Sequence, residues 1–179
     1  KGFFHKTLLS AIVSAACVLS VQAQSDLFID GLRSYQQGSP QDAIEFFKQE
    51  IGQNPSNDAA YYYLYTLYTT RDIVAAEAYL KRAVELDPEN YWYKYSLAVF
   101  YSHTDRNELT IKLLEELMAE YPKKNGLYLD AANIYISQKE TDKALETLDR
   151  IELIRGKSET IALTRLELLT KKPGANADS

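Results

Sequence analysis

Hydrophobic residues recur along the chain at intervals of three and four positions, the spacing that gathers side chains on one face of an α-helix. Four such segments each end at a proline or a glycine: AIEFFKQEIGQNP, AEAYLKRAVELDP, TIKLLEELMAEYP and ALETLDRIELIRG. A second amphipathic segment precedes each of them: DLFIDGLRSYQQG, AYYYLYTLYTT, YWYKYSLAVFYSH and LYLDAANIYISQ. The pattern predicts a repeated unit of helix, turn and helix, and it does not fit the alternation of strands.

The period of the repeat is set by residues that end helices. Pro55, Pro88 and Pro122 are 33 and 34 residues apart, and Gly156 follows Pro122 by 34. Proline cannot continue a helix, and glycine commonly ends one. A period of this size is typical of stacked helix pairs. We therefore expect an all-α, right-handed solenoid of antiparallel helix pairs, with about four repeats and a terminal capping helix.

These segments resemble the tetratricopeptide repeat family over residues 24–156. The family favours a small residue in the eighth place of its unit and Tyr in the eleventh, then two alanines around an aromatic or Leu on the second helix, and a closing proline. The residues in those places are Gly31, Ala43, Phe47 and Pro55 in repeat one; Tyr68, Ala76, Leu80, Ala83 and Pro88 in repeat two; Ala98, Tyr101, Leu114 and Pro122 in repeat three; and Ala132, Tyr135, Ala144 and Leu148 in repeat four.

Some positions depart from the family's pattern. Tyr65 occupies the small place of repeat two, whose inner turn is one residue short, and the alanines of the facing helix are expected to accommodate the ring. Glu50 takes the later alanine place of repeat one, where we expect it to face solvent. Ser39, Asn90 and Thr141 are expected to cap the helices that follow them.

The segment after Gly156, KSETIALTRLELLT, aligns with the first helix of a fifth repeat. Arg165 stands there where a buried Leu is expected, which predicts a capping helix with a polar outer face. The alternative is a longer array of which this chain is a part. The repeat domain is thus assigned to residues 24–170, and residues 171–179 form a polar tail.

Residues 1–23 have the layout of a secretory signal peptide. Lys1 and Lys6 flank the start, an apolar run covers residues 7–21, and small residues lead to Ala23. The run is shorter than the roughly 20 residues that span a bilayer. We expect cleavage after Ala23 and no membrane span afterwards; the alternatives are a retained anchor or a lipid attached to Cys17.

The charge of the remaining chain argues against nucleic acid as a partner. Removing residues 1–23 takes two lysines and no acid from 20 basic and 25 acidic residues, which leaves a net charge of -7. An acidic surface repels phosphate backbones. Cys17 is the only cysteine, so the cleaved chain would contain no disulfide or reactive thiol.

Residues suited to catalysis or to metal binding are scarce. His103 is the only histidine after residue 23, in the segment Ser102 to Asp105. Ser, His and Asp that are adjacent in sequence usually form a turn, because catalytic groups converge from separate elements. One His and no Cys do not make a metal site, and the glycines are isolated from one another. We therefore expect no enzymatic activity, no cofactor and no metal.

The family resemblance implies which aromatic residues are exposed. Its inward places fall on Leu97, Ala98 and Tyr101, which should lie in the core. Its concave surface is lined by other places of each first helix, which here carry Phe28, Tyr62, Trp92, Tyr95, Leu129 and Asn133. These six form the predicted partner-binding groove. The alternative is that the rings only pack between neighbouring repeats.

The function that the resemblance implies is scaffolding. The members of the family that grip an acidic C-terminal tail use Lys and Asn where this chain has Phe28 and Leu32, so an apolar peptide segment or a partner domain is the better expectation. We interpret the chain as an exported, non-catalytic protein-binding scaffold of the bacterial cell envelope, periplasmic or associated with the outer envelope. The alternative is a structural subunit in which the repeats act as a spacer. The sequence leaves the oligomeric state open.

The signal-peptide assignment predicts the mass of the exported protein. The mature chain should begin at Gln24, because the small residues before it suit a signal peptidase. Intact-mass spectrometry of the protein recovered from the cell envelope checks this. A mature species that retains Cys17 and carries an added lipid mass would contradict it.

Overall fold

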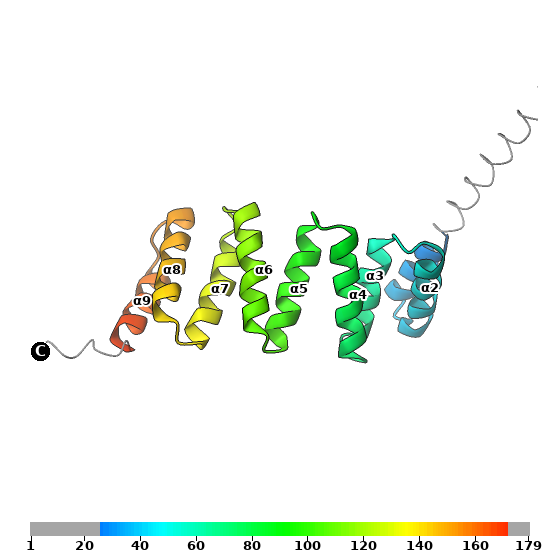
Figure 1. Ribbon diagram of the computed structural model, residues 1–179, viewed down its shortest axis with the longest axis horizontal. Helices are drawn as coiled ribbons and strands as arrows, with labels where there is room; N and C mark the ends of the chain where they lie inside the picture. Colours follow the sequence, from blue (N-terminus) through cyan, green and yellow to red (C-terminus); the bar gives the residue numbers. More distant parts are fainter. Residues whose placement is uncertain (1–25, 172–179) are drawn as a thin grey trace, which may run out of the picture. The chain divides into compact units, whose positions relative to one another are not determined.

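The computed structural model of the chain describes residues 26–171, and these are almost entirely helical. Residues 26–36 form a first helical segment. It is followed by α2 (Pro40–Gln53), α3 (Asp58–Tyr68), α4 (Ile73–Leu86), α5 (Tyr91–His103), α6 (Asn107–Glu120), α7 (Asn125–Ser137), α8 (Thr141–Arg155) and α9 (Glu159–Lys171) (Figure 1). Within the described range no residue belongs to a strand.

The predicted helix ends are confirmed at the outer turns. Pro55, Pro88 and Pro122 lie in the turns that follow α2, α4 and α6. Gly156 ends α8 with a φ of 85°, a conformation that costs glycine little because it has no Cβ. The spacing of these four residues is therefore equal to the period of the helix pairs in the structure.

The inner turns show a feature that the sequence pattern does not contain. Gly38, Asp105 and Lys139 all have positive φ, and each stands two residues before the helix that follows, α2, α6 or α8. Repeat two, which is one residue short, has no such residue. Its turn ends instead at Asp72, whose Oδ1 accepts hydrogen bonds from the backbone N–H groups of Val74 and Ala75, each at 3.0 Å. A side-chain cap thus replaces the left-handed residue.

One of the three expected caps is confirmed. Asn90 Oδ1 accepts a hydrogen bond from the backbone N–H of Trp92 at 3.1 Å and so caps α5. Ser39 occupies the N-cap position of α2, but its side chain makes no capping hydrogen bond. The expectation for Thr141 is wrong because Thr141 is already the first residue of α8 and Glu140 stands at the N-cap.

The described chain divides into two compact units, one ending at Tyr93 and one starting at Lys94. In the N-terminal unit α3 packs against both α2 and α4. One core cluster is formed by Ala43, Ile44, Phe47, Ala60, Leu64 and Leu67, with Phe28 and Tyr63 packed against it. On α4, Ala76, Leu80 and Ala83 are fully buried. The residues in the family's inward places therefore supply the core of this unit.

In the C-terminal unit α7 packs against α6 and α8, and α8 packs against α9. Ala132, Leu148, Ile151 and Ile161 form one core cluster there. Leu97, Ala98 and Tyr101 are also buried, which confirms their predicted inward orientation.

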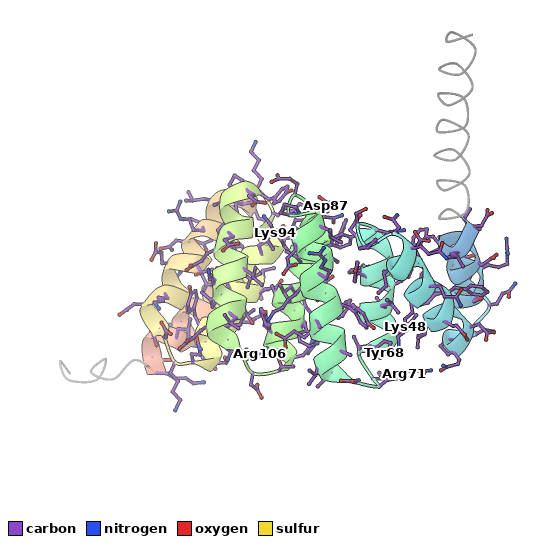
Figure 2. All side chains as sticks on the ribbon, turned by 45° about the vertical axis from the view of Figure 1, so that its right-hand side comes forward. Lys48, Tyr68, Arg71, Asp87, Lys94 and Arg106 are labelled. Atoms are coloured by element: carbon purple, nitrogen blue, oxygen red, sulfur yellow. The ribbon has the colours of Figure 1, made fainter. Side chains whose placement is uncertain are left out.

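Charged side chains reinforce the contacts between neighbouring helices within each unit. The Arg106 guanidinium lies 4.5 Å from the ring centre of Tyr101, and Lys94 Nζ of α5 lies 2.5 Å from Glu120 Oε1 of α6 (Figure 2). In the N-terminal unit, Lys48 Nζ of α2 lies 5.3 Å from the ring centre of Tyr68 of α3. A hydrogen bond with Tyr68 raises the pKa of Lys48, so the charged amine is favoured there.

The expectation that Glu50 faces solvent is wrong. Glu50 is 1% exposed, and its Oε1 accepts hydrogen bonds from the side-chain amides of Asn57 at 2.8 Å and Asn54 at 3.4 Å. Asn57 in turn caps α3 by accepting a hydrogen bond from the Ala60 N–H at 3.1 Å. Glu50 therefore joins the end of α2 to the start of α3 around the Pro55 turn, a role that an alanine cannot fill.

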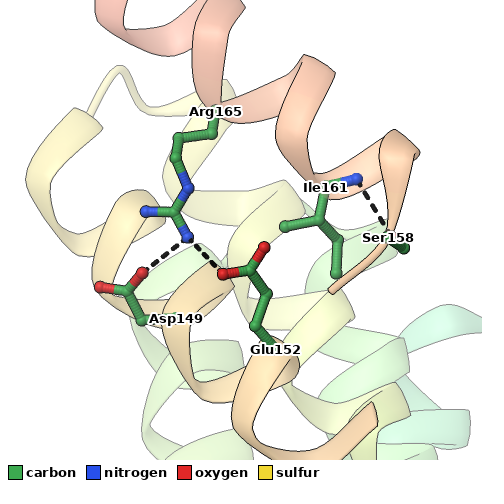
Figure 3. A network of polar contacts seen from close by, with 5 residues as sticks. All are labelled: Asp149, Glu152, Ser158, Ile161 and Arg165. Atoms are coloured by element: carbon green, nitrogen blue, oxygen red, sulfur yellow. Dashed lines mark hydrogen bonds and ion pairs between the residues drawn. The ribbon is translucent and has the colours of Figure 1, made fainter. Parts of the chain in front are cut away.

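The last helix is held by charge but is not polar on its outer face. Figure 3 shows Arg165 Nη2 of α9 bonded to Asp149 Oδ1 at 2.6 Å and to Glu152 Oε2 at 3.2 Å, both on α8. However, Leu163 and Leu166 of α9 are 59% and 60% exposed. The expectation of a polar outer face is therefore wrong. Arg165, the residue that suggested it, instead binds α9 to α8.

Packing around Gly31 predicts opposite effects for two Gly→Ala substitutions. A Cβ at Gly31 would lie 2.6 Å from Phe47 Cε1. The Phe47 ring cannot withdraw easily, because it is fully buried and stacks on Tyr63 at 5.2 Å between ring centres. Overpacking costs about 1–3 kcal/mol, which exceeds the gain of up to about 1 kcal/mol from alanine's helix propensity. Gly31→Ala should lower the free energy of unfolding, as measured by urea titration followed by circular dichroism.

Gly52→Ala is the matched control, because Gly52 also lies in a helix but a Cβ there would meet nothing within 4 Å. This variant should raise the free energy of unfolding by about 0.5–1 kcal/mol. Equal stabilisation by both substitutions would contradict the close approach at Gly31.

Candidate functional site

The aromatic residues at the start of α5 have two different environments. Trp92 is 64% exposed, and its ring meets that of Tyr91 edge to face at 5.1 Å between ring centres. Tyr93 is only 8% exposed and stacks on Tyr62 of α3 at 4.9 Å. Successive positions of a helix are about 100° apart. Neighbouring residues of this run therefore point to different sides of α5, Trp92 to solvent and Tyr93 to the packing.

Tyr93 joins two first helices through a hydrogen bond. Its hydroxyl donates to Asp58 Oδ2 at 2.8 Å, from α5 to the start of α3. Burial and this contact raise the pKa of Tyr93 well above its usual range, because a phenolate would be poorly solvated and would face a carboxylate. Tyr93 is therefore part of the packing of the N-terminal unit.

Tyr95 makes the corresponding contact in the C-terminal unit. Its hydroxyl donates to Asp130 Oδ2 of α7 at 2.9 Å. In both pairs the tyrosine and the aspartate are 35 residues apart. Each unit thus contains one tyrosine of α5 whose hydroxyl is bonded to a carboxylate on another first helix.

A cavity of about 460 Å³ lies in the C-terminal unit beside the Tyr95–Asp130 contact. Its volume is within the range of ligand pockets in proteins, about 300–1,000 Å³. Three helices and one turn supply the lining: Tyr95, Ala98, Val99, Ser102 and His103 from α5, Asp105 from the turn, Asn107, Thr110 and Leu114 from α6, and Asp130, Asn133, Ile134 and Ser137 from α7. The wall therefore combines an apolar part with carboxylate, amide, hydroxyl and imidazole groups.

Ser102, His103 and Asp105 all line this cavity, but they are not arranged as a catalytic triad. Asp105 has a φ of 57°, and its backbone N–H donates to the Ser102 carbonyl at 3.2 Å, so the segment is a tight turn. In the described part of the chain no hydrogen bond joins the three side chains. A nucleophile paired with an oriented base requires such bonds. Across residues 26–171 no group of His, Cys, Asp and Glu side chains is arranged to hold a metal ion.

The structure places the six residues of the predicted groove in different settings. Phe28 packs against the core, with its ring centre 5.7 Å from that of Phe47, and Tyr62 stacks on Tyr93. These two rings therefore take part in packing. Leu129 of α7 is 36% exposed and Trp92 of α5 is more so. Tyr95 and Asn133 line the cavity together.

Sequence reasoning missed Asp130 and His103 as members of this site. His103 was interpreted as a turn residue only, and Asp130 received no assignment. The repeat period held a signal for Asp130, because the position 34 residues after a first-helix residue lies at the same height of the next repeat. Asp130 follows Tyr95 by 35 positions, one more than the repeat period, and its carboxylate is therefore close enough to accept a hydrogen bond from the Tyr95 hydroxyl.

Two models of the tetratricopeptide repeat family match the sequence, one at residues 31–91 and the other at residues 106–166. No curated protein is significantly similar to the chain in sequence.

Several solved structures resemble the chain. A tetratricopeptide repeat protein from Parabacteroides merdae has a TM-score of 0.71 at 19% identity, covering 82% of this chain and 59% of that chain. A double mutant of MamA RS-1 has a TM-score of 0.67 at 16% identity, covering 86% and 88%. PilF of Pseudomonas aeruginosa has a TM-score of 0.60 at 19% identity, covering 85% and 70%. At these identities the likeness concerns the fold, and it confirms an all-α solenoid of helix pairs.

The burial of Tyr93 predicts a loss of stability at alkaline pH. Its pKa is higher in the folded chain than the ordinary value of 10.0. Its contribution to stability is therefore fully present below pH 10 and is lost as the pH rises toward the folded pKa. Tyr93→Phe should make the decline of unfolding free energy above pH 10 less steep, as measured by urea titrations at several pH values.

Tyr35→Phe is the control for this experiment, because Tyr35 belongs to the same unit and is 42% exposed. It should leave the pH dependence unchanged. At neutral pH, Tyr93→Phe should cost about 1 kcal/mol for the lost hydrogen bond to Asp58. Identical alkaline profiles for the wild type and Tyr93→Phe would show that the hydroxyl is not buried in the folded chain.

Proposed function

Since this chain belongs to the tetratricopeptide repeat family, whose repeats generally serve protein–protein interaction, we propose that it is a non-catalytic scaffold of the bacterial cell envelope. It holds a segment of a partner protein against the exposed side of α5 and α7. The family membership carries the general role. The position of the binding surface rests on the cavity beside Tyr95 and Asp130.

Two exposed apolar residues lie close to the cavity along these helices. Trp92 precedes Tyr95 by three positions on α5, and Leu129 precedes Asn133 by four positions on α7. Residues three or four apart share one face of a helix. Each helix therefore carries an exposed apolar side chain one turn from a cavity residue. Exposed aromatic residues beside a pocket are the usual anchors of protein interfaces.

The mixed lining of the cavity can receive a side chain of a bound peptide segment. Binding sites fix a ligand's orientation with a few polar groups and gain affinity from apolar area. Here Ala98, Val99 and Ile134 provide the apolar part, while Asn133 and Asp130 provide polar groups. A side chain of a bound segment would enter the cavity, and its neighbours would contact Trp92 or Leu129.

The envelope location of the scaffold is supported by sequence alone. The signal-like residues 1–23 lie outside the residues that the structure describes, and so does Cys17. Within residues 26–171 no helix is both long enough and apolar enough to cross a membrane. The proposal is that the repeat domain works in the periplasm or at the outer envelope after export.

One observation favours the second candidate function, a structural subunit in which the repeats act as a spacer. Leu163, Leu166 and Leu169 recur every three residues on α9 and are all more than two-fifths exposed. Such a row on a helix suits packing by another helix. In that case the outer face of α9, and not the cavity, would make the main contact with the assembly.

Trp92→Ala tests the proposed binding surface. It should weaken binding of a partner recovered from envelope extract at least about tenfold, equivalent to 1.4 kcal/mol, because a large anchoring ring is lost. The melting temperature should change little, since the ring is 64% exposed. Calorimetric titration and thermal unfolding monitored by circular dichroism measure the two effects separately.

Leu153→Ala is the matched control, because Leu153 lies on α8 and is 80% exposed. It should change neither binding nor the melting temperature. If Trp92→Ala binds the partner as the wild type does while Leu163→Ala or Leu166→Ala weakens binding, the spacer function is supported and the proposed surface is wrong. A large fall in melting temperature for Trp92→Ala would show that the ring belongs to the packing.

A further inference from the structure

The charged groups that line the cavity in the C-terminal unit are acidic. Asp105 and Asp130 contribute carboxylates to its lining, which contains no Lys or Arg. The imidazole of His103 is the one other titratable group of that lining besides the Tyr95 hydroxyl. The wall therefore offers hydrogen-bond acceptors and negative charge without an internal counter-charge.

Several other carboxylates of the same unit have cationic partners. Glu120 pairs with Lys94 at 2.5 Å, and Asp149 pairs with Arg165 at 2.6 Å. Asp130 receives the neutral Tyr95 hydroxyl instead, and no ion pair of Asp130 is found among the described residues. Asp130 thus differs from the ion-paired carboxylates of the unit in facing the cavity with a neutral partner.

This difference determines which ligands the cavity favours. Asp130 is half-buried, so water solvates it less completely than a surface carboxylate, and one hydroxyl compensates only in part. A cation placed against it would gain Coulomb energy at a lower effective dielectric than in bulk water. A carboxylate or phosphate would be repelled by both aspartates, and the chain as a whole is acidic.

Among protein cations, arginine fits the arrangement of acceptors best. A guanidinium has five N–H donors in one plane, whereas an ammonium is a compact point charge. Acceptors are spread around the cavity on Asp130, Asn133, Ser102 and Ser137. The apolar wall around Ala98 and Val99 can cover the methylene stem, as commonly occurs for arginine.

We propose that the cavity between α5 and α7 binds an arginine side chain of the partner segment, with the guanidinium against Asp130. This inference rests on the proposed function, because it names the side chain that the bound segment inserts. Tyr95 is a positioning residue in it, since its hydroxyl holds the Asp130 carboxylate at the cavity wall.

A charge-matched pair of peptides tests the proposal on the full chain. The probe is a short blocked alanine peptide with one central arginine, and the comparison peptide carries citrulline, which has the same shape without the charge. Titrations followed by ¹H–¹⁵N NMR should show shifts at Asn133, Asp130 and Ser102 with the arginine peptide. The citrulline peptide should bind at least about tenfold more weakly, as expected for the loss of one charge-assisted contact.

Variants that remove one negative charge locate the effect. Asp130→Asn keeps an acceptor for the Tyr95 hydroxyl and should reduce the arginine preference to within about twofold. Asp105→Asn should weaken arginine binding to a smaller degree, and asparagine tolerates the φ of 57° at that position. Glu116→Gln is the control, because Glu116 is exposed on α6 outside the cavity lining and its loss changes net charge equally.

The outcomes separate this inference from the proposed function. If arginine and citrulline peptides bind equally at the cavity, or if Asp130→Asn and Asp105→Asn both retain the full preference, the arginine inference is wrong while peptide binding stands. If neither peptide shifts any resonance of α5 or α7, the arginine inference is overturned. The binding of the envelope partner to wild type and Trp92→Ala then tests independently whether the proposed surface is used. Should Asp130→Asn lose helical signal, Asp105→Asn alone decides the charge dependence.

Discussion

The close approach of paired helices is the constraint on which this structure depends. Gly31, Ala98 and Ala132 occupy the same place in three repeats and are all buried. At Gly31 the Phe47 ring fills the space that a Cβ would need. Helices that approach so closely leave little room for a larger side chain, so the large side chains of these three repeats lie beside the contact. The repeat that departs, with Tyr65 in the small place, keeps that ring only partly buried, and burial raises its pKa.

The helices and most of the core could be predicted because both depend on local periods. Positions three and four apart define a face, and positions 33 or 34 apart define the equivalent face of the next repeat. The residues that escaped prediction depend on what a neighbouring element presents. Glu50 is buried because two asparagines of the next turn meet its carboxylate. Lys139 takes a positive φ because the length of its turn requires it, although its side chain gives no sign of this.

The repeat period identifies some residues of the candidate cavity, and the neighbouring elements determine the others. Tyr95 and Asn133 were assigned from their places in the repeat, and both line the cavity. Phe28 and Tyr62 hold equivalent places, but neighbouring rings cover them in the N-terminal unit. The position in a repeat fixes the direction of a side chain, whereas its exposure depends on the size of its neighbours. Asp130 could not be assigned by type alone, because a helical aspartate is normally a solvated surface residue.

The cavity and the outer face of α9 represent two different kinds of contact surface. The leucines of α9 would contribute apolar area, which gives affinity to any matching helix face but little discrimination between partners. The cavity contains a carboxylate without a cationic partner, which attracts cationic side chains and repels anionic ones. A scaffold that selects its partner needs the second property, whereas a spacer within a fixed assembly needs only the first. The selectivity of binding, more than its strength, therefore distinguishes the two functions.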